Sequence, residues 1–230
     1  ILGTTTDTDD IIGTVLSTNE VTVSLPQIEE ALKMQIGEID QVPPMYSARK
    51  VQGKKLYELA RQGKVIERTP KKVRIYDITI VEAKLPMVTI KIRCGGGTYI
   101  RSICRDVGET LGCGGMMGEL LRTRVSEFQV EDSLRLDQIE EKMKAGTIEN
   151  YMVAVDHVFS DCPEVIMKDD GDRMLYNGNQ FRLCNVMPVN ADIMDGSYVR
   201  VYDSEHCFQA VYQFQIEGTI FKPYKMFLDR

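Results

Sequence analysis

The sequence predicts an α+β protein of two domains, a sheet with flanking helices over residues 1–160 and a small β-barrel over residues 161–230. Three observations carry this prediction. In the first domain, helices with their own start and stop signals are mixed with β-rich strands. In the second, short β-rich runs follow one another at close spacing and are separated by turns. The length of 230 residues suits two ordinary domains.

Three helices are predicted from their ends. Ser24-Leu25-Pro26-Gln27 supplies an N-cap, a first-turn proline and a capping-box glutamine, and Gly37 ends the segment. Residues 54–62 and 135–145 predict two further helices, each followed by a glycine. Their helically spaced apolar side chains are expected to point inward: Ile28, Leu32 and Ile36 in the first, Leu56, Leu59 and Ala60 in the second, and Leu136, Ile139 and Met143 in the third.

The strands are predicted from alternation and from β-branched residues. Val88, Ile90 and Ile92 alternate with polar residues, which is typical of a half-buried strand. Residues 73–82 are expected to pair with it across a turn at Pro86. The barrel strands are expected at 182–189, 198–202, 207–214 and 219–221.

Composition excludes several classes of protein. The longest apolar runs are too short for a transmembrane helix. The six cysteines include no C-x-x-C pair, and there are only two histidines, which argues against a structural zinc site. The chain is also too long and too poor in cysteine for a disulfide scaffold, so we expect reduced thiols in a cytosolic protein.

Charge is segregated along the chain. Residues 1–40 hold one base and eight acids, residues 41–74 hold ten bases and two acids, and residues 161–230 hold seven bases and eleven acids. The basic block contains Tyr46 and Tyr57, and bases interleaved with tyrosines suit phosphate contact and base stacking. A solvated lysine-rich surface explains the same pattern equally well, and the block alone does not decide between them.

Residues 94–112 hold the most informative pattern. A strand leads into three glycines, Thr98 is the predicted N-cap of a helix, and Gly112 closes that helix. Arg101 lies in the first turn, where a cation opposes the helix dipole by roughly 0.3–1 kcal/mol. Either Arg101 is a surface residue that tolerates this cost, or a carboxylate from elsewhere faces it. With Tyr99 beside it, the second interpretation suits a base-binding active site. A nucleotide-binding loop is disfavoured, since neither a Gly-Lys-Ser/Thr ending nor G-x-G-x-x-G is present.

Gly97-Thr98-Tyr99-Ile100-Arg101-Ser102 resembles the G-T-Y-I-R-[ST] motif of the TruB family of tRNA pseudouridine synthases. Other segments agree with that family in the same order along the chain. They are Gly3, Thr6, Thr8, Asp10 and Gly13; the run from Gln41, Pro43 and Pro44 to Gly63; Leu111-Gly112-Cys113-Gly114; Glu119 to Arg124; and Phe221 to Phe227, which resembles the family's PUA domain.

The resemblance implies a fold, a reaction and a set of site residues. The fold is a mixed synthase sheet, incomplete at its N-terminus, with flanking helices and a small C-terminal PUA-like β-barrel. The reaction is isomerisation of the T-loop uridine at tRNA position 55 to pseudouridine, with no cofactor and no metal. The implied catalytic residues are Tyr99, Arg101 and Leu121, and the implied RNA-binding residues are Lys50, Tyr57 and Arg61. The implied partner is the T-stem-loop of tRNA in the cytoplasm, with no membrane and no obligatory protein partner.

One expected part of the family pattern is missing. The family's nucleophilic aspartate lies in a G-x-L-D-x-x-A-T-G motif upstream of the first matching block, and this sequence contains no such motif. We therefore expect a fragment that is inactive alone, with Arg101 placed to hold an aspartate that the fragment lacks. We also expect an unpaired sheet edge that favours self-association. The alternatives are a non-catalytic RNA-binding module on the same fold and, less favoured, an RNA-guided relative with protein partners.

Overall fold

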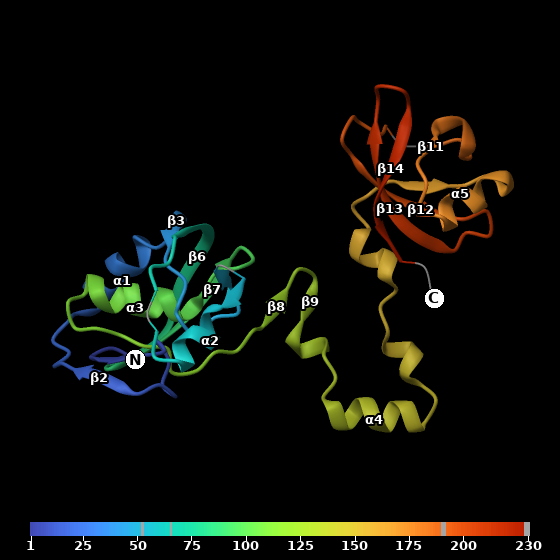
Figure 1. The fold of residues 1–230 in the computed structure, drawn as a ribbon. Helices are drawn as coiled ribbons and strands as arrows, with labels where there is room; N and C mark the ends of the chain where they lie inside the picture. The colour runs from blue at the N-terminus through green and yellow to red at the C-terminus, as the bar shows by residue number, and fades with distance from the viewer. Residues whose placement is uncertain (52, 65, 190–191, 228–230) are drawn as a thin grey trace. The chain divides into compact units, whose positions relative to one another are not determined.

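The computed structural model describes residues 1–51, 53–64, 66–189 and 192–227. The chain forms two compact units, Ile1–Asp132 and Ser133–Arg230 (Figure 1). The predicted boundary between residues 160 and 161 therefore falls inside the second unit, and the division into domains at that point stays a prediction.

The first unit is built around a three-stranded antiparallel sheet in the order β3-β6-β7. Its strands are β3 (Gly37–Gln41), β6 (Lys71–Lys84) and β7 (Met87–Cys94). The predicted pairing of β6 with β7 across Pro86 is confirmed, and side chains along β7 alternate between exposed and half-buried. Two helices, α1 (Leu25–Lys33) and α3 (Ile100–Thr110), pack on one face of this sheet. The shared core includes Ile28, Leu32, Ile75, Ile78, Ile103 and Val107.

Short elements complete this unit. The hairpin of β1 (Thr4–Thr6) and β2 (Val15–Thr18) lies near the start of the chain. A second small hairpin leads into the helix that was predicted for residues 54–62, which is shorter than expected because the hairpin takes its first two residues. The elements are β4 (Lys50–Val51), β5 (Lys54–Lys55), α2 (Leu56–Arg61), β8 (Arg124–Val125), β9 (Phe128–Gln129) and the 3-10 turn Val130–Asp132.

The ends of α1 and α3 test the predicted caps. The Ser24 amide donates to Gln27 Oε1 at 2.8 Å, so the predicted capping-box contact is confirmed. The N-cap of α3 is Tyr99, so the prediction of Thr98 was wrong by one residue. The Thr98 hydroxyl instead donates to the Gly95 carbonyl at 2.8 Å and closes the glycine turn.

The second unit contains a five-stranded mixed sheet in the order β10-β12-β13-β14-β11, in which β10 is parallel to β12. Its core includes Val165, Val199, Val201, Tyr212 and Phe221. The expected strand at 182–189 was mostly wrong, because only its first residue belongs to a strand and a 3-10 turn follows. The strands are β10 (Glu164–Ile166), β11 (Phe181–Arg182), β12 (Tyr198–Tyr202), β13 (Phe208–Gln215) and β14 (Ile220–Met226); the helices are α4 (Leu136–Lys144) and α5 (Asp172–Tyr176); the 3-10 turns are Ile148–Tyr151, Val155–Phe159, Asp169–Gly171 and Leu183–Asn185.

Helix α4 confirms one prediction and corrects another. The helix forms where its caps predicted it. Two of its three supposedly inward side chains are exposed, however, with Leu136 at 85% and Met143 at 64% exposure, and only Ile139 is half-buried. An amphipathic pattern shows that a helix has an apolar side, but it does not say what covers that side.

The contact of α3 with the segment after it gives a stability prediction. A Cβ placed on Gly108 would lie 2.2 Å from the Gly115 nitrogen and 2.3 Å from the Gly114 carbonyl carbon. Gly108→Ala should therefore lower the free energy of unfolding by about 2 kcal/mol, because backbone strain outweighs the gain of about 1 kcal/mol in helix propensity. Urea unfolding measures this. Gly96→Ala is the control, since nothing lies within 4 Å of its Cβ position, and an equal loss in both variants would contradict the packing argument.

Candidate active site and nucleic-acid interface

The first turn of α3 is fixed by a buried glutamine. Gln41, the last residue of β3, is 1% exposed. Its Oε1 accepts a 2.8 Å hydrogen bond from the Tyr99 amide, and its Nε2 donates to the Tyr99 carbonyl at 3.1 Å. One side chain therefore satisfies both backbone groups of Tyr99, and the end of the sheet determines where the helix starts.

Arg101 connects two segments that are far from it in the chain. Its Nη1 donates to the Thr8 carbonyl at 3.2 Å, and its Nη2 donates to the Tyr46 carbonyl at 2.8 Å. The guanidinium of Arg101 is therefore held by specific partners and is not a free surface side chain. A guanidinium has five N–H donors, so these two bonds fix its position and leave it able to hold a carboxylate as well.

A second arginine of α3 lies beside it and was not singled out from the sequence. Arg105 Nη1 lies 3.1 Å from Asp9 Oδ2, and its Nη2 lies 2.7 Å from Asp106 Oδ1. Burial raises the pKa of the Asp9 carboxyl, although Arg105, Arg101 and Arg68 act to lower it. Only the spacing of Arg101 and Arg105 by four residues could have suggested that both face the same segment.

Hydrogen bonds hold only some of the predicted catalytic residues near one another. Tyr99 and Arg101 share the first turn of α3. Leu121 lies between α3 and β8, and its side chain is 71% exposed. Within the described residues, Leu121 makes no hydrogen bond to Arg101 or to the partners of Arg101. The catalytic role of Leu121 therefore stays a prediction.

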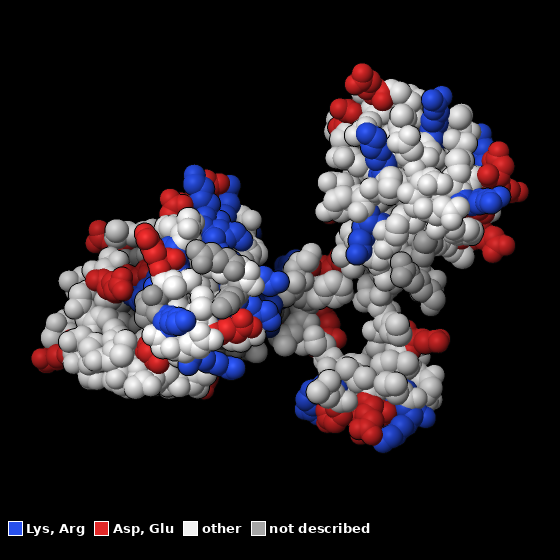
Figure 2. All heavy atoms as spheres, in the orientation of Figure 1, with Lys and Arg blue, Asp and Glu red and all other residues white. Residues whose placement is uncertain are grey.

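The predicted RNA-binding residues form a basic cluster around α2. Lys50 lies directly opposite Lys55 in the β4–β5 hairpin. The Arg61 guanidinium lies 5.4 Å from the centre of the Tyr57 ring, and Lys55 Nζ lies 5.4 Å from it as well. Lys and Arg side chains are conspicuous on the side of the first unit where β6, β7 and α2 lie (Figure 2). Since like charges in opposite positions of a hairpin destabilise it, this arrangement suits an anionic partner.

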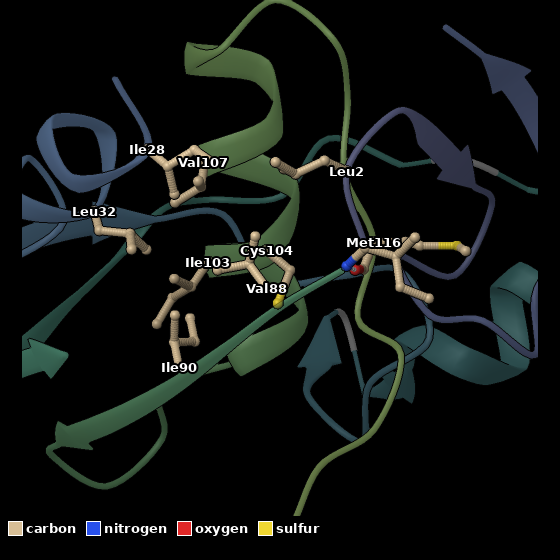
Figure 3. Close-up of a pocket in the computed structure, with 10 residues that line it drawn as sticks. Leu2, Ile28, Leu32, Val88, Ile90, Ile103, Cys104, Val107 and Met116 are labelled. Atoms are coloured by element: carbon tan, nitrogen blue, oxygen red, sulfur yellow. Dashed lines mark hydrogen bonds between the residues drawn. The ribbon is translucent and has the colours of Figure 1, made fainter. Parts of the chain in front are cut away.

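An apolar pocket between α1, α3 and β7 is not a substrate site. Figure 3 shows Ile103, Cys104 and Val107 of α3 facing Val88 and Ile90 of β7. The cavity of about 40 Å³ is lined by apolar side chains and Cys104, with no charged side chain to bind the polar edge of a nucleobase. Burial raises the pKa of the Cys104 thiol to about 11, so this cysteine is a neutral thiol at physiological pH and not a nucleophile.

Among the residues that the structure describes, no group of three or more His, Cys, Asp or Glu side chains is arranged to hold a metal ion. No helix within the same residues is long and apolar enough to cross a membrane.

Family models match the first 160 residues. Residues 1–100 match the N-terminal domain of TruB family pseudouridylate synthase, and residues 101–160 match the tRNA pseudouridylate synthase B C-terminal domain. Residues 1–160, which include α3 and its first turn, thus match the pseudouridine synthase class of protein.

Curated relatives agree with these models. The chain is 46% identical over 198 residues to tRNA pseudouridine synthase B of Lachnoclostridium phytofermentans, covering 82% of this chain and 64% of that protein. It is 44% identical to the Alkaliphilus oremlandii protein of the same name, covering 78% and 59%, and 40% identical to that of Clostridium novyi, covering 90% and 69%. The chain belongs to the TruB family. It spans less than two thirds of the length of the first two of these relatives.

Solved structures support the fold alone. A Cbf5–Nop10–Gar1 complex matches with a TM-score of 0.65 at 22% identity, covering 91% of this chain and 64% of the other. An H/ACA RNP bound to a substrate RNA containing 2'-deoxyuridine matches with a TM-score of 0.63 at 22% identity, covering 90% and 62%. The predicted α+β fold class is therefore confirmed.

The Gln41 contact gives a second stability prediction. Gln41→Ala removes the acceptor of the Tyr99 amide and one of two donors to the Tyr99 carbonyl, which keeps the Ile103 amide at 3.3 Å. An unsatisfied buried amide costs about 1–3 kcal/mol. The free energy of unfolding in urea should fall by about 2 kcal/mol or more. The same substitution at exposed Gln62 is the control and should cost at most about 0.5 kcal/mol. Equal effects at both positions would show that Gln41 does not hold the start of α3.

Proposed function

We propose that this chain is part of a tRNA pseudouridine synthase that isomerises the T-loop uridine at tRNA position 55 to pseudouridine. The observation that carries the proposal is Arg101, anchored by two backbone carbonyls at the start of α3 within a TruB family chain. The family reaction detaches the base from C1′, turns it, and rejoins it through C5.

The proposed roles follow from the positions of the side chains. Arg101 holds the nucleophilic aspartate ionised, because an adjacent guanidinium lowers the pKa of a carboxyl. Tyr99 packs beside the target uridine, and the exposed side chain of Leu121 packs on the flipped base. The aspartate itself belongs to the upstream motif that this sequence does not contain. The proposed chemistry uses no metal and no cofactor.

The proposed partner is the T-stem-loop of tRNA. Lys50 and Arg61 contact phosphates, and Tyr57 lies between the cations that surround it. Residues 161–230, whose sheet is described above, act as a PUA-like RNA-binding domain. The proposed location is the cytoplasm, and the proposal requires no protein partner.

A non-catalytic RNA-binding module is the second candidate. It is favoured by one observation: the two hydrogen bonds of Arg101 among the described residues both go to backbone carbonyls, as those of a purely structural arginine would. Under this alternative, the basic cluster around α2 keeps its role and Arg101 only connects the Thr8 and Tyr46 segments.

Tritium release decides between the two candidates. A T-stem-loop RNA carrying 5-tritiated uridine is incubated with this 230-residue chain, with the full-length protein, and with full-length Arg101→Ala. We expect release only by the unsubstituted full-length protein, because the chain lacks the nucleophile and the variant cannot hold it. Release by the chain alone would place a nucleophile within these residues. No release by the full-length protein would favour the module, and near-normal single-turnover conversion by Arg101→Ala would contradict the role of that residue.

The basic cluster predicts a salt-dependent loss of affinity. Lys50→Ala and Arg61→Ala in the full-length protein should each weaken binding of T-stem-loop RNA and reduce the slope of log K against log salt by about one. Fluorescence anisotropy over a salt series measures both quantities. Lys144→Ala is the control, since Lys144 is paired with Glu140 on α4. An unchanged slope in the α2 variants would remove them from the interface.

A further inference from the structure

The loop between β1 and β2 holds Asp9 in a left-handed backbone conformation. Its φ angle is +59°, a region that residues other than glycine rarely enter. The conformation is fixed from two directions, because the Asp9 amide donates to the Thr6 carbonyl at 3.3 Å and the Met117 amide donates to the Asp9 carbonyl at 3.0 Å. The loop therefore presents the Asp9 side chain in one defined place.

That place is beside Arg105 of α3. The Asp9 and Arg105 side chains are only 16% and 19% exposed, and their charged atoms are 3.1 Å apart. The rest of the Arg105 guanidinium is already held, since its Nε and Nη2 donate to Asp106 Oδ1 at 2.9 and 2.7 Å. The position of the Arg105 guanidinium is thus fixed on the helix, and its ion pair with Asp9 holds the loop between β1 and β2 next to α3.

The residue before Asp9 carries the carbonyl that Arg101 uses. Arg101 Nη1 donates to the Thr8 carbonyl at 3.2 Å. Arg101 and Arg105 are four residues apart on α3, so they lie on the same side of the helix and face the same loop. Asp9 directly follows Thr8 in the chain, so the Asp9–Arg105 pair holds the backbone next to the Thr8 carbonyl.

The Asp9–Arg105 pair contributes to the position of the loop rather than to the free energy of unfolding. Burial raises the pKa of the Asp9 carboxyl above its ordinary value, despite the nearby cations of Arg105, Arg101 and Arg68, and Asp106 raises it further. A carboxyl whose pKa is raised on folding stabilises the fold below its unfolded pKa and loses that contribution as the pH rises through its folded pKa. The ionised Asp9 therefore does not stabilise the fold at neutral pH, which agrees with the general cost of burying ion pairs.

We propose that the Asp9–Arg105 ion pair positions Arg101, by holding the Thr8 carbonyl where it fixes the guanidinium for catalysis. Asp9 and Arg105 are positioning residues that act through Arg101. The inference rests on the proposed function, because the role of Arg101 in uridine isomerisation is part of that proposal. It adds two residues that the motif resemblance does not assign.

The test uses single-turnover conversion of T-stem-loop RNA by the full-length protein. Asp9→Asn should lower the rate at saturating RNA by about tenfold to a hundredfold, the effect of a misplaced catalytic group. The dissociation constant for RNA and the melting temperature should stay close to those of the unsubstituted protein. Arg105→Lys, which keeps the charge but lacks the planar fork, should lower the rate by less. Glu109→Gln is the matched control, because Glu109 also faces Arg105 but is 66% exposed, and its rate should be unchanged.

The decisive comparison is made in an Arg101→Lys background. If Asp9 acts through Arg101, Asp9→Asn should lower the rate of Arg101→Lys much less than it lowers the rate of the unsubstituted protein. Equal fold losses in the two backgrounds, or an unchanged rate in Asp9→Asn, would overturn the inference. If Asp9→Asn does not fold, Arg105→Lys decides by the same comparison. Lack of conversion by the unsubstituted full-length protein would instead refute the proposed function, so the two failures are distinguishable.

Discussion

The hydrogen bonds at the first turn of α3 hold together segments that are far apart in the chain. Gln41 binds both backbone groups of Tyr99, and the buried Ser102 hydroxyl donates to the Val42 carbonyl at 3.0 Å. Arg101 extends the same connection to Thr8 and Tyr46. Apolar packing of α3 on the sheet sets the position of the helix axis. These polar contacts fix its first turn and the loops beside it, and every proposed catalytic role of Tyr99 and Arg101 depends on them.

The cationic side chains near the N-terminus of α3 are unfavourable for helix stability but suitable for an active site that holds a carboxylate. Arg101 lies in its first turn, where the positive end of the dipole opposes a cation by roughly 0.3–1 kcal/mol. Backbone carbonyls offset this for Arg101, and one turn further along Asp9 and Asp106 neutralise Arg105. A cation in the first turn runs against the local preference of a helix. Departures from local preference of this kind are typical of functional positions.

Local signals in the sequence predicted several of the elements but not their contacts. The Ser24–Gln27 box and the alternation along β7 depend on neighbouring residues, so they could be predicted. The choice of Tyr99 over Thr98 as N-cap depends on Gln41, which is 58 residues away in the chain. Any threonine after a glycine turn satisfies the local rule for an N-cap, and only the tertiary contact decides between the two positions.

The same reasoning explains which parts of the site the sequence could not show. The position of Arg101 in a first turn left open a surface arginine or a facing carboxylate. The structure supplies two backbone carbonyls, which carry no residue-type signature. The Asp9–Arg105 pair joins residues 96 positions apart, so no spacing rule could reveal it. Family motifs identified Asp10 in that loop and passed over Asp9, since a resemblance reports shared residues rather than the contacts of one chain.

The basic hairpin and Arg101 are linked through a short stretch of backbone. The Tyr57 amide donates to the Ser47 carbonyl at 3.1 Å, and the Leu56 amide donates to the Arg49 carbonyl at 2.9 Å. These bonds attach α2 to the segment whose Tyr46 carbonyl holds Arg101. The facing lysines of the hairpin repel each other until an anion lies between them. Under the proposed function, RNA phosphates that neutralise this repulsion stabilise the same segment that orients Arg101, so RNA binding and the geometry of the site are physically coupled.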